Sequence, residues 1–201
     1  MPQPLAPLNQ ARLVLASASP RRAMLLEQIG VGFEVAPSSV EEVVAEDMTP
    51  GEVVESLSHQ KATDVAMGRP EVDLVLGADT VVVSEGRILG KPVDAEDATR
   101  MLQALSGRWH QVFTGFTLVS PKTGRTVSGF TVSDVRFREL TEAEIAAYVA
   151  TGEPLDKAGA YGIQERGALL VAEIRGDYSH IVGLPLPAVA AAWRELGWSA
   201  L

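Results

Sequence analysis

Cysteine is absent from this sequence of 201 residues, which excludes disulfide bonds, thiolate nucleophiles and sulfur-ligated zinc. Long apolar runs are absent too, since none approaches the roughly 20 residues that a membrane-spanning helix needs. Residues 1–10 contain no lysine or arginine with which a secretory signal could begin. We therefore expect a soluble, cytoplasmic protein with no membrane partner, whose chemistry uses oxygen, nitrogen or a hard metal ion.

Positive charge is scarce, because 17 lysines and arginines face 26 aspartates and glutamates and the formal net charge is −9. Basic patches that neutralise phosphates drive the binding of nucleic-acid polymers, so such a polymer is not the expected partner. A small anion remains a suitable ligand where a few cations converge. His59, His110 and His180 lie far apart and lack the spacing of a metal site or a catalytic triad. We expect all three to be surface or hydrogen-bonded core residues.

Apolar residues make up 46% of the chain, which is enough for one hydrophobic core. We therefore expect a single domain over residues 1–201, with residues 1–10 as a flexible N-terminal extension. Hairpins mixed with single helices predict an α/β fold with a mixed, twisted sheet. The expected elements are strands at 12–16, 33–36, 74–83, 112–119, 126–137, 169–174 and 180–182, helices at 20–30, 49–68, 94–106, 141–152 and from 187, and a glycine-rich loop at 159–167.

The segment Ser17–Arg22, with the sequence SASPRR, runs from an expected strand into an expected helix. Free backbone amides at a helix start carry partial positive charge, Ser19 can cap them, and arginine binds phosphate oxygens as a bidentate fork. Neighbouring side chains diverge by about 100° on a helix, so Arg21 and Arg22 are expected to act differently. The segment is a candidate anion site, and the alternative is an ordinary capped helix with solvated arginines.

Asp79 interrupts the apolar strand expected at 74–83. An unpaired carboxylate buried there would be costly, so it should meet a cation, a metal ion or a cleft, unless residues 77–79 form a turn. Lys91 is one candidate cation. A three-residue hairpin loop would place Lys91 opposite Asp79, whereas a two-residue loop would place it opposite Thr80 and break the pairing. A solvent-exposed hairpin lysine is the alternative.

Lys61 lies on the apolar side of the helix expected at 49–68. A cation on this inner face needs an anion, and the alternative is a lysine that extends to solvent from the edge of the apolar stripe. Glu41 and Glu42 offer carboxylates that could hold a hard cation beside Asp79. The alternative for this pair is a solvated acidic loop.

Five short motifs occur in order along the chain, and together they resemble those of the Maf family. They are SASPRR at 17–22, GADT at 77–80, GKP at 90–92, LSG at 105–107 and DKAGAYGIQ at 156–164. The resemblance implies a nucleoside triphosphate pyrophosphatase with an elongated α/β fold, related in architecture to inosine triphosphate pyrophosphatases, and with a deep central cleft between lobes. It also implies a divalent cation, Mg²⁺ or Mn²⁺.

The resemblance assigns roles to single residues. It makes Asp79 the proton acceptor for the attacking water and Glu42 a cleft carboxylate linked to metal or water, so these two are the candidate metal ligands. Lys91 is the third candidate catalytic residue, and the resemblance implies that it lies beside the triphosphate. The candidate substrate-binding residues are Ser17, Arg21, Arg22, Lys61, Thr80 and Gln164.

Within the family, Thr80 and the sequence at 161–164 resemble the branch that acts on dTTP and UTP. The branch that acts on 7-methyl-GTP usually has a glutamine after the catalytic aspartate. The resemblance therefore implies that Arg22, Thr80 and Gln164 are specificity positions.

Two departures from the family pattern concern selectivity. Glu165 follows Gln164 where relatives usually have a glycine, so a positive φ at this position would require the loop to adjust. Trp109 replaces a small polar residue that usually follows the LSG motif.

The function that follows is hydrolysis of nucleoside triphosphates, with dTTP and UTP as the expected substrates, to the monophosphate and pyrophosphate. The reaction is a metal-assisted attack of water on the α-phosphorus, and removal of non-standard nucleotides is one use for it. Two other functions stay open: a non-catalytic, nucleotide-sensing regulator of cell division or septum formation, and a nucleotidyl- or phosphotransferase. The sequence also leaves the oligomeric state open, with a homodimer as one option.

Overall fold

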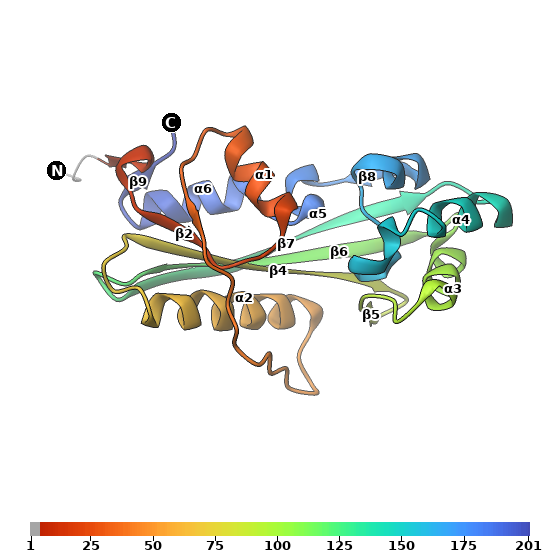
Figure 1. The fold of residues 1–201 in the computed structure, drawn as a ribbon, viewed down its shortest axis with the longest axis horizontal. Helices are drawn as coiled ribbons and strands as arrows, with labels where there is room; N and C mark the ends of the chain where they lie inside the picture. Colours follow the sequence, from red (N-terminus) through yellow and green to blue (C-terminus); the bar gives the residue numbers. More distant parts are fainter. Residues whose placement is uncertain (1–4) are drawn as a thin grey trace. The chain divides into compact units, whose positions relative to one another are not determined.

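A mixed sheet runs through the computed structural model, which describes residues 5–201 (Figure 1). Within these residues seven strands form the sheet. Strand β2 is parallel to β3 and β4, whereas β5 is antiparallel to β4 and β8 is antiparallel to β7. The predicted mixed α/β fold is therefore confirmed. In spatial order the strands are β3 (Glu34–Val35), β2 (Leu13–Leu15), β4 (Leu74–Ser84), β6 (Trp109–Ser120), β7 (Arg125–Phe137) and β8 (Val171–Arg175), with β5 (Arg87–Leu89) paired to β4.

The helices begin at the signals that the sequence provides. Thr49 and Thr141 each form a complete capping box with the glutamate three residues later, and Asp94 caps its helix by accepting a hydrogen bond from the amide of Asp97. The helices are α1 (Pro20–Gln28), α2 (Pro50–Met67), α3 (Ala95–Leu105), α4 (Glu142–Val149), α5 (Tyr178–Val182) and α6 (Leu186–Glu195), with short 3₁₀ turns η1 (Leu8–Gln10), η2 (Glu153–Asp156), η3 (Ala158–Ala160) and η4 (Glu165–Leu170).

The chain divides into two compact units. Unit 1 contains the described residues up to Asp79 together with Thr114–Thr131 and Gly183–Leu201. Unit 2 contains Thr80–Phe113 and Val132–Val182. Strands β4, β6 and β7 each contribute residues to both units, and the division on β4 falls between Asp79 and Thr80.

In unit 1 the helix α2 packs directly on the sheet, on the opposite side from α1 and α6 (Figure 1). Two glycines permit the close approach. A Cβ at Gly77 of β4 would overlap the carbonyl oxygen of Ser58, and a Cβ at Gly115 of β6 would overlap that of Val54. Backbone therefore lies against backbone. Small and branched apolar side chains fill the space around these contacts: Val14, Ala16, Ala62, Val65, Ala66, Val72 and Val75.

In unit 2 an aromatic cluster lies in the core. The rings of His110, Phe137 and Tyr161 meet edge to face, with centroids 4.7 to 5.3 Å apart. The imidazole Nε2 of His110 and the hydroxyl of Tyr161 share a hydrogen bond of 2.8 Å. Burial lowers the pKa of His110 to about 4. This histidine is thus a neutral core residue, as the sequence predicts.

Two local predictions differ from the structure. The strand predicted at 180–182 is wrong, because these residues belong to helix α5; Asp177 starts it by accepting a hydrogen bond from the amide of Ser179 (2.8 Å). A three-residue apolar run has no periodicity that separates a strand from a helix. The loop predicted at 159–167 contains parts of two 3₁₀ turns.

The N-terminal segment is built into unit 1 where the structure describes it. Of the extension predicted at 1–10, residues 1–4 lie outside the described residues. Strand β1 (Ala6–Pro7) pairs in parallel with β9 (Trp198–Ser199), and Leu8 is buried.

Candidate active site

Two carboxylates meet on one ammonium group in unit 1. The Nζ of Lys61 lies 2.5 Å from Oδ1 of Asp79 and 2.9 Å from Oε1 of Glu42. The side chains of Lys61 and Asp79 are about equally buried, 16% and 15% exposed, whereas Glu42 is half exposed at 48%. Lys61 therefore neutralises one of two negative charges in a largely desolvated place.

The elements that hold this cluster follow from the sequence. Asp79 ends a run of five fully buried residues, Leu74 to Ala78, so β4 carries its carboxylate out of the core. Lys61 comes from the face of α2 that packs on the sheet, beside the buried Ala62. The predictions that Asp79 meets a cation and that Lys61 meets an anion are both confirmed, because they meet each other.

Lys91 is not opposite Asp79. Strand β5 pairs with β4 in the register Ser84 to Arg87, which leaves a two-residue loop of Glu85 and Gly86 with φ of +51° and +75°. Two successive residues of positive φ form the tight turn whose twist suits a hairpin. Of the two loop lengths considered from the sequence, the two-residue loop is the one present, so the pairing of Lys91 with Asp79 is not formed. The ladder ends at Leu89, and its register continued would set Lys91 against Thr80.

Arg22 is drawn inward at the start of α1. Its Nη1 donates to Oγ of Ser17 at 2.8 Å, and its Nε donates to the carbonyl oxygen of Gly183 at 2.9 Å. Burial lowers the pKa of Arg22, and the nearby charges of Asp79 and Glu42 raise it. The guanidinium is therefore within electrostatic reach of the carboxylate cluster.

The other residues of the SASPRR segment also have distinct positions. Ser19 occupies the cap position but makes no capping hydrogen bond with its side chain, so the predicted cap is wrong. Ser17 stabilises the turn that leads into the helix, because its Oγ accepts from the amide of Ser19 at 3.2 Å. Arg21 is half-buried, and its charge lowers the pKa of Arg22.

The loop that carries Glu42 is tied to α2 by two side chains that the sequence analysis missed. The amide of Gln60 pairs with both backbone groups of Val43, and the carboxylate of Asp64 binds Ser38 and Ser39. Both anchors flank Lys61 on one helix, four residues apart. A polar pair at this spacing beside a lysine is the signal that could have found them.

Thr80 and Gln164 belong to unit 2. Gln164 precedes η4 in extended backbone, and Glu165 after it has a φ of +53°. The left-handed conformation that a glycine would favour is thus present, and a glutamate adopts it. The departure from the family pattern therefore falls on a position with positive φ, where a residue with a Cβ is strained.

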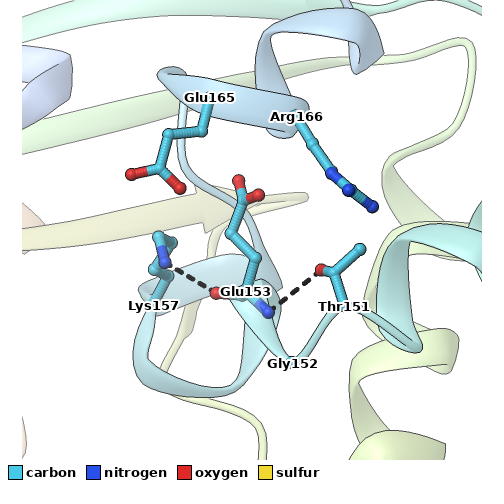
Figure 2. Close-up of a pocket in the computed structure, with 6 residues that line it drawn as sticks. All are labelled: Thr151, Gly152, Glu153, Lys157, Glu165 and Arg166. Atoms are coloured by element: carbon cyan, nitrogen blue, oxygen red, sulfur yellow. Dashed lines mark hydrogen bonds between the residues drawn. The ribbon is translucent and has the colours of Figure 1, made fainter.

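A pocket of about 610 Å³ lies beside this segment (Figure 2). Within it Glu153 is held in place: its Oε1 accepts from the hydroxyl of Tyr148 at 2.9 Å and from the amide of Gly167 at 3.1 Å. Nζ of Lys157 donates to the carbonyl oxygen of Glu153 at 2.6 Å. Gln164 is not one of the lining residues, which are Thr151, Gly152, Glu153, Lys157, Glu165 and Arg166.

The remaining candidates are structural. His59 is exposed, whereas His180 is buried and its Nε2 shares a hydrogen bond of 2.6 Å with Oγ of Ser133.

Trp109 packs under the guanidinium of Arg175, whose carbon lies 4.2 Å from the ring centroid. The second departure from the family pattern is therefore a cation–π contact on the surface of unit 2. Across residues 5–201 no three His, Asp or Glu side chains are grouped as a ready-made metal site.

Fold and site together define an α/β protein in which a mixed sheet carries a carboxylate–lysine cluster within reach of an arginine-bearing helix start. The chain belongs to the Maf family, because the profile described as Maf-like protein matches residues 12–196.

Relatives cover almost the whole chain. Two proteins named dTTP/UTP pyrophosphatase are among them. The one from Acetivibrio thermocellus is 48% identical over 94% of this chain and 98% of its own. The one from Moorella thermoacetica is 55% identical over 88% of this chain and 90% of its own.

Solved structures match more distantly. The Ham1 protein of Staphylococcus aureus has a TM-score of 0.45 and 16% identity over 63% of this chain and 71% of its own. A nucleoside-triphosphatase (dITP/XTP pyrophosphatase) of Mycobacterium abscessus has the same score and identity over 92% and 96%. Within residues 5–201 no helix combines the length and apolar character needed to cross a membrane.

Proposed function

We propose that this protein hydrolyses nucleoside triphosphates, with dTTP and UTP as preferred substrates, to the monophosphate and pyrophosphate. The observation that carries the proposal is the meeting of Asp79 and Glu42 on Lys61, with the guanidinium of Arg22 in electrostatic reach. Carboxylates beside cations suit the activation of water next to a polyphosphate. Relatives named for this activity support it.

In the proposed reaction the water oxygen forms a bond to the α-phosphorus while the bond from that phosphorus to the bridging oxygen of the β-phosphate breaks. The proton of the water passes to the carboxylate of Asp79, which acts as general base. Pyrophosphate leaves with the bridging oxygen and its electron pair. Arg21, Arg22, Lys61 and Lys91 bind the phosphates and stabilise the charge that develops on the leaving group.

Glu42 and Asp79 fit a divalent cation. Both are oxygen ligands of the kind that Mg²⁺ and Mn²⁺ prefer, and they already converge on one positive charge at the Nζ of Lys61. Two carboxylates leave coordination positions for phosphate oxygens, as Mg²⁺ sites commonly do. When bound, the cation would neutralise phosphate charge and polarise the α-phosphate.

Selection of the base is assigned to Arg22, Thr80 and Gln164. A side-chain amide offers a donor and an acceptor, which match the O4 and N3–H edge of uracil or thymine. An unmatched buried amide costs about 1–3 kcal/mol, so roughly ten- to hundredfold discrimination against purines is expected. Gln164→Ala should reduce this discrimination more than it reduces turnover.

The test is a panel of dTTP, UTP, ATP, GTP and 7-methyl-GTP with purified protein, in which pyrophosphate, orthophosphate and any transfer product are measured. The expected result is pyrophosphate with the highest kcat/KM for dTTP and UTP. Orthophosphate as the main product, or a preference for purines, would contradict the proposal. Binding without turnover would favour the nucleotide-sensing regulator, and a product joined to a second acceptor would favour the transferase.

The proposal also includes the setting of the reaction. We infer a cytoplasmic enzyme whose partner is a small nucleotide rather than a nucleic-acid polymer or a membrane. The net charge of −9 supports this choice, because it disfavours polyanionic surfaces. Fractionation of cells and gel filtration of the purified protein test the location and whether it forms a homodimer.

A further inference from the structure

Glu42 reaches its partners from a long irregular segment. Between β3 and α2, residues 36–48 contain no helix or strand (Figure 1). The Glu42 side chain is half exposed, and the residue Val43 is 68% exposed, so packing does little to hold this part of the segment. An exposed, irregular backbone is normally mobile. Something other than a hydrophobic contact must therefore keep Glu42 on Lys61.

The side-chain amide of Gln60 supplies that restraint. Its Nε2 donates to the carbonyl oxygen of Val43 at 2.7 Å, and its Oε1 accepts from the amide of Val43 at 3.0 Å. The amide thus pairs with the residue directly after Glu42 as a neighbouring β-strand would. A third bond, from Nε2 to Oγ of Ser56 at 3.1 Å, sets the orientation of the amide on α2.

A second anchor holds the start of the segment. The Oδ2 atom of Asp64 accepts from Oγ of Ser38 at 2.7 Å and from the amide of Ser39 at 3.1 Å. Oγ of Ser38 in turn accepts from the amide of Val40 at 3.1 Å. Helix α2 therefore holds the loop through Gln60 and Asp64, which lie on either side of Lys61 in the helix. Lys61 and the loop that carries Glu42 are thus both fixed to α2.

We propose that Gln60 is a positioning residue for the reaction: it holds the Glu42 carboxylate at Lys61 and Asp79, and Asp64 assists by anchoring the loop at 38–39. The effect of Gln60 on turnover rests on the proposed function. The effect of Gln60 on the position of the loop does not depend on any activity. Displacement of a reacting group by about 1 Å can cost about 100-fold in rate, so loss of the pair should reduce kcat by about 10- to 100-fold.

The test variant is Gln60→Met, which keeps the length and the helix propensity of the side chain and removes both hydrogen bonds to Val43. Gln103→Met is the matched control, because Gln103 is an exposed glutamine on helix α3. Amide hydrogen exchange should become at least about tenfold faster in residues 38–48 of Gln60→Met, and it should stay unchanged in the control. Unchanged protection of this segment in Gln60→Met would overturn the proposal, whether or not the protein is an enzyme.

A double-mutant cycle tests the catalytic consequence. If Gln60 acts through Glu42, Gln60→Met should lower kcat in the wild-type background and have almost no effect in Glu42→Gln. The concentration of Mg²⁺ needed for half-maximal rate should rise in Gln60→Met, while the KM for nucleotide changes little. The positioning role would be overturned if the kcat losses of Gln60→Met and Glu42→Gln multiplied in the double variant. A wild-type kcat in Gln60→Met would overturn it as well. The absence of pyrophosphate from the wild-type protein would instead reject the proposed function, and the exchange measurement would still decide the role of Gln60.

Discussion

Single residues determine the chemistry of the cluster. Asp79 combines a nearly buried side chain with a direct contact to Lys61, and the same ammonium holds Glu42. Replacement of Asp79 by asparagine preserves shape but removes both the charge and the proton acceptor. This substitution therefore distinguishes a catalytic role of Asp79 from a purely structural one.

We predict that Asp79→Asn lowers kcat by about 10²- to 10⁴-fold, because a general base contributes about this much. The fold should remain, since the substituted side chain has nearly the same volume and Glu42 still balances Lys61. The measurement is kcat for dTTP together with the far-UV circular dichroism spectrum and the Tm. A folded variant that retains more than about a third of the wild-type rate would remove Asp79 from the mechanism.

Glu165 shows a different residue-scale effect, since its φ of +53° places a side-chain-bearing residue in the left-handed region. This conformation costs about 1–2 kcal/mol for an ordinary residue, and part of the gain on substitution is lost to the greater freedom of glycine when unfolded. We predict that Glu165→Gly raises the free energy of unfolding by about 0.5–1 kcal/mol. Glu165→Ala keeps the Cβ and should show no such gain, as urea denaturation of the two variants can establish.

Elements differ in how far local sequence determines them. The capping boxes at Thr49 and Thr141 and the cap at Asp94 specify helix starts because donor and acceptor lie within four residues. Helix α5 also has a local cap, since Asp177 accepts from the amide of Ser179, but its five residues are too few to show a helical period. The contact from Ser133 to His180 spans 47 residues and is invisible in a single sequence, so nothing local separated α5 from a strand.

The same limit applies to the site. Hydrophobic pattern alone predicts that Asp79 and Lys61 need partners, but it does not say that they partner each other across 18 residues. The hairpin register depends on whether Glu85 accepts a positive φ, a choice that decides the side of the sheet on which Lys91 falls. Gln60 and Asp64 were missed because their partners, the backbone of Val43 and Ser39 and the hydroxyl of Ser38, belong to an irregular segment that has no sequence pattern.

At the element scale, the packing of α2 on the sheet should control the cluster. A Cβ at Gly77 would overlap the carbonyl oxygen of Ser58 and approach the amide of Ala62 at 2.8 Å. We predict that Gly77→Ala pushes α2 away from β4, lowers the free energy of unfolding by about 1–3 kcal/mol and reduces kcat, because Lys61 moves with its helix.

Gly32→Ala is the control for this prediction, since a Cβ at Gly32 meets no atom within 4 Å. Urea denaturation and kcat should be close to those of the wild type in this variant. Equal stability and turnover in Gly77→Ala and Gly32→Ala would show that the helix does not need its close approach to the sheet.

At the scale of the whole molecule, two buried histidines link stability to pH. Burial lowers the pKa of His110 to about 4 and that of His180 to about 4, although the charge of Asp177 opposes the shift at His180. Unfolded histidine binds a proton near pH 6.5. Between these two pH values the unfolded chain binds more protons than the folded chain. The free energy of unfolding is therefore highest above about pH 6.5 and falls as the pH drops toward 4.

We predict that each histidine removes up to about 3 kcal/mol from the free energy of unfolding over this window. Urea denaturation at several pH values between about 4.5 and 7 measures the slope. His110→Gln, which retains a polar partner for Tyr161, should have a shallower slope than the wild type. Parallel slopes would show that His110 is protonated to the same extent in the folded and unfolded states.

The boundary between Asp79 and Thr80 has a consequence for how such a protein can diversify. The residues proposed for water activation and phosphate binding lie in unit 1, apart from Lys91. Of the three positions assigned to base selection, Arg22 lies in unit 1, whereas Thr80 and Gln164 lie in unit 2. Changes of nucleotide preference can therefore accumulate in segments that contribute nothing to the carboxylate–lysine cluster. Exchange of residues 159–170 with a relative of different preference offers a route to new selectivity that leaves the hydrolytic residues untouched.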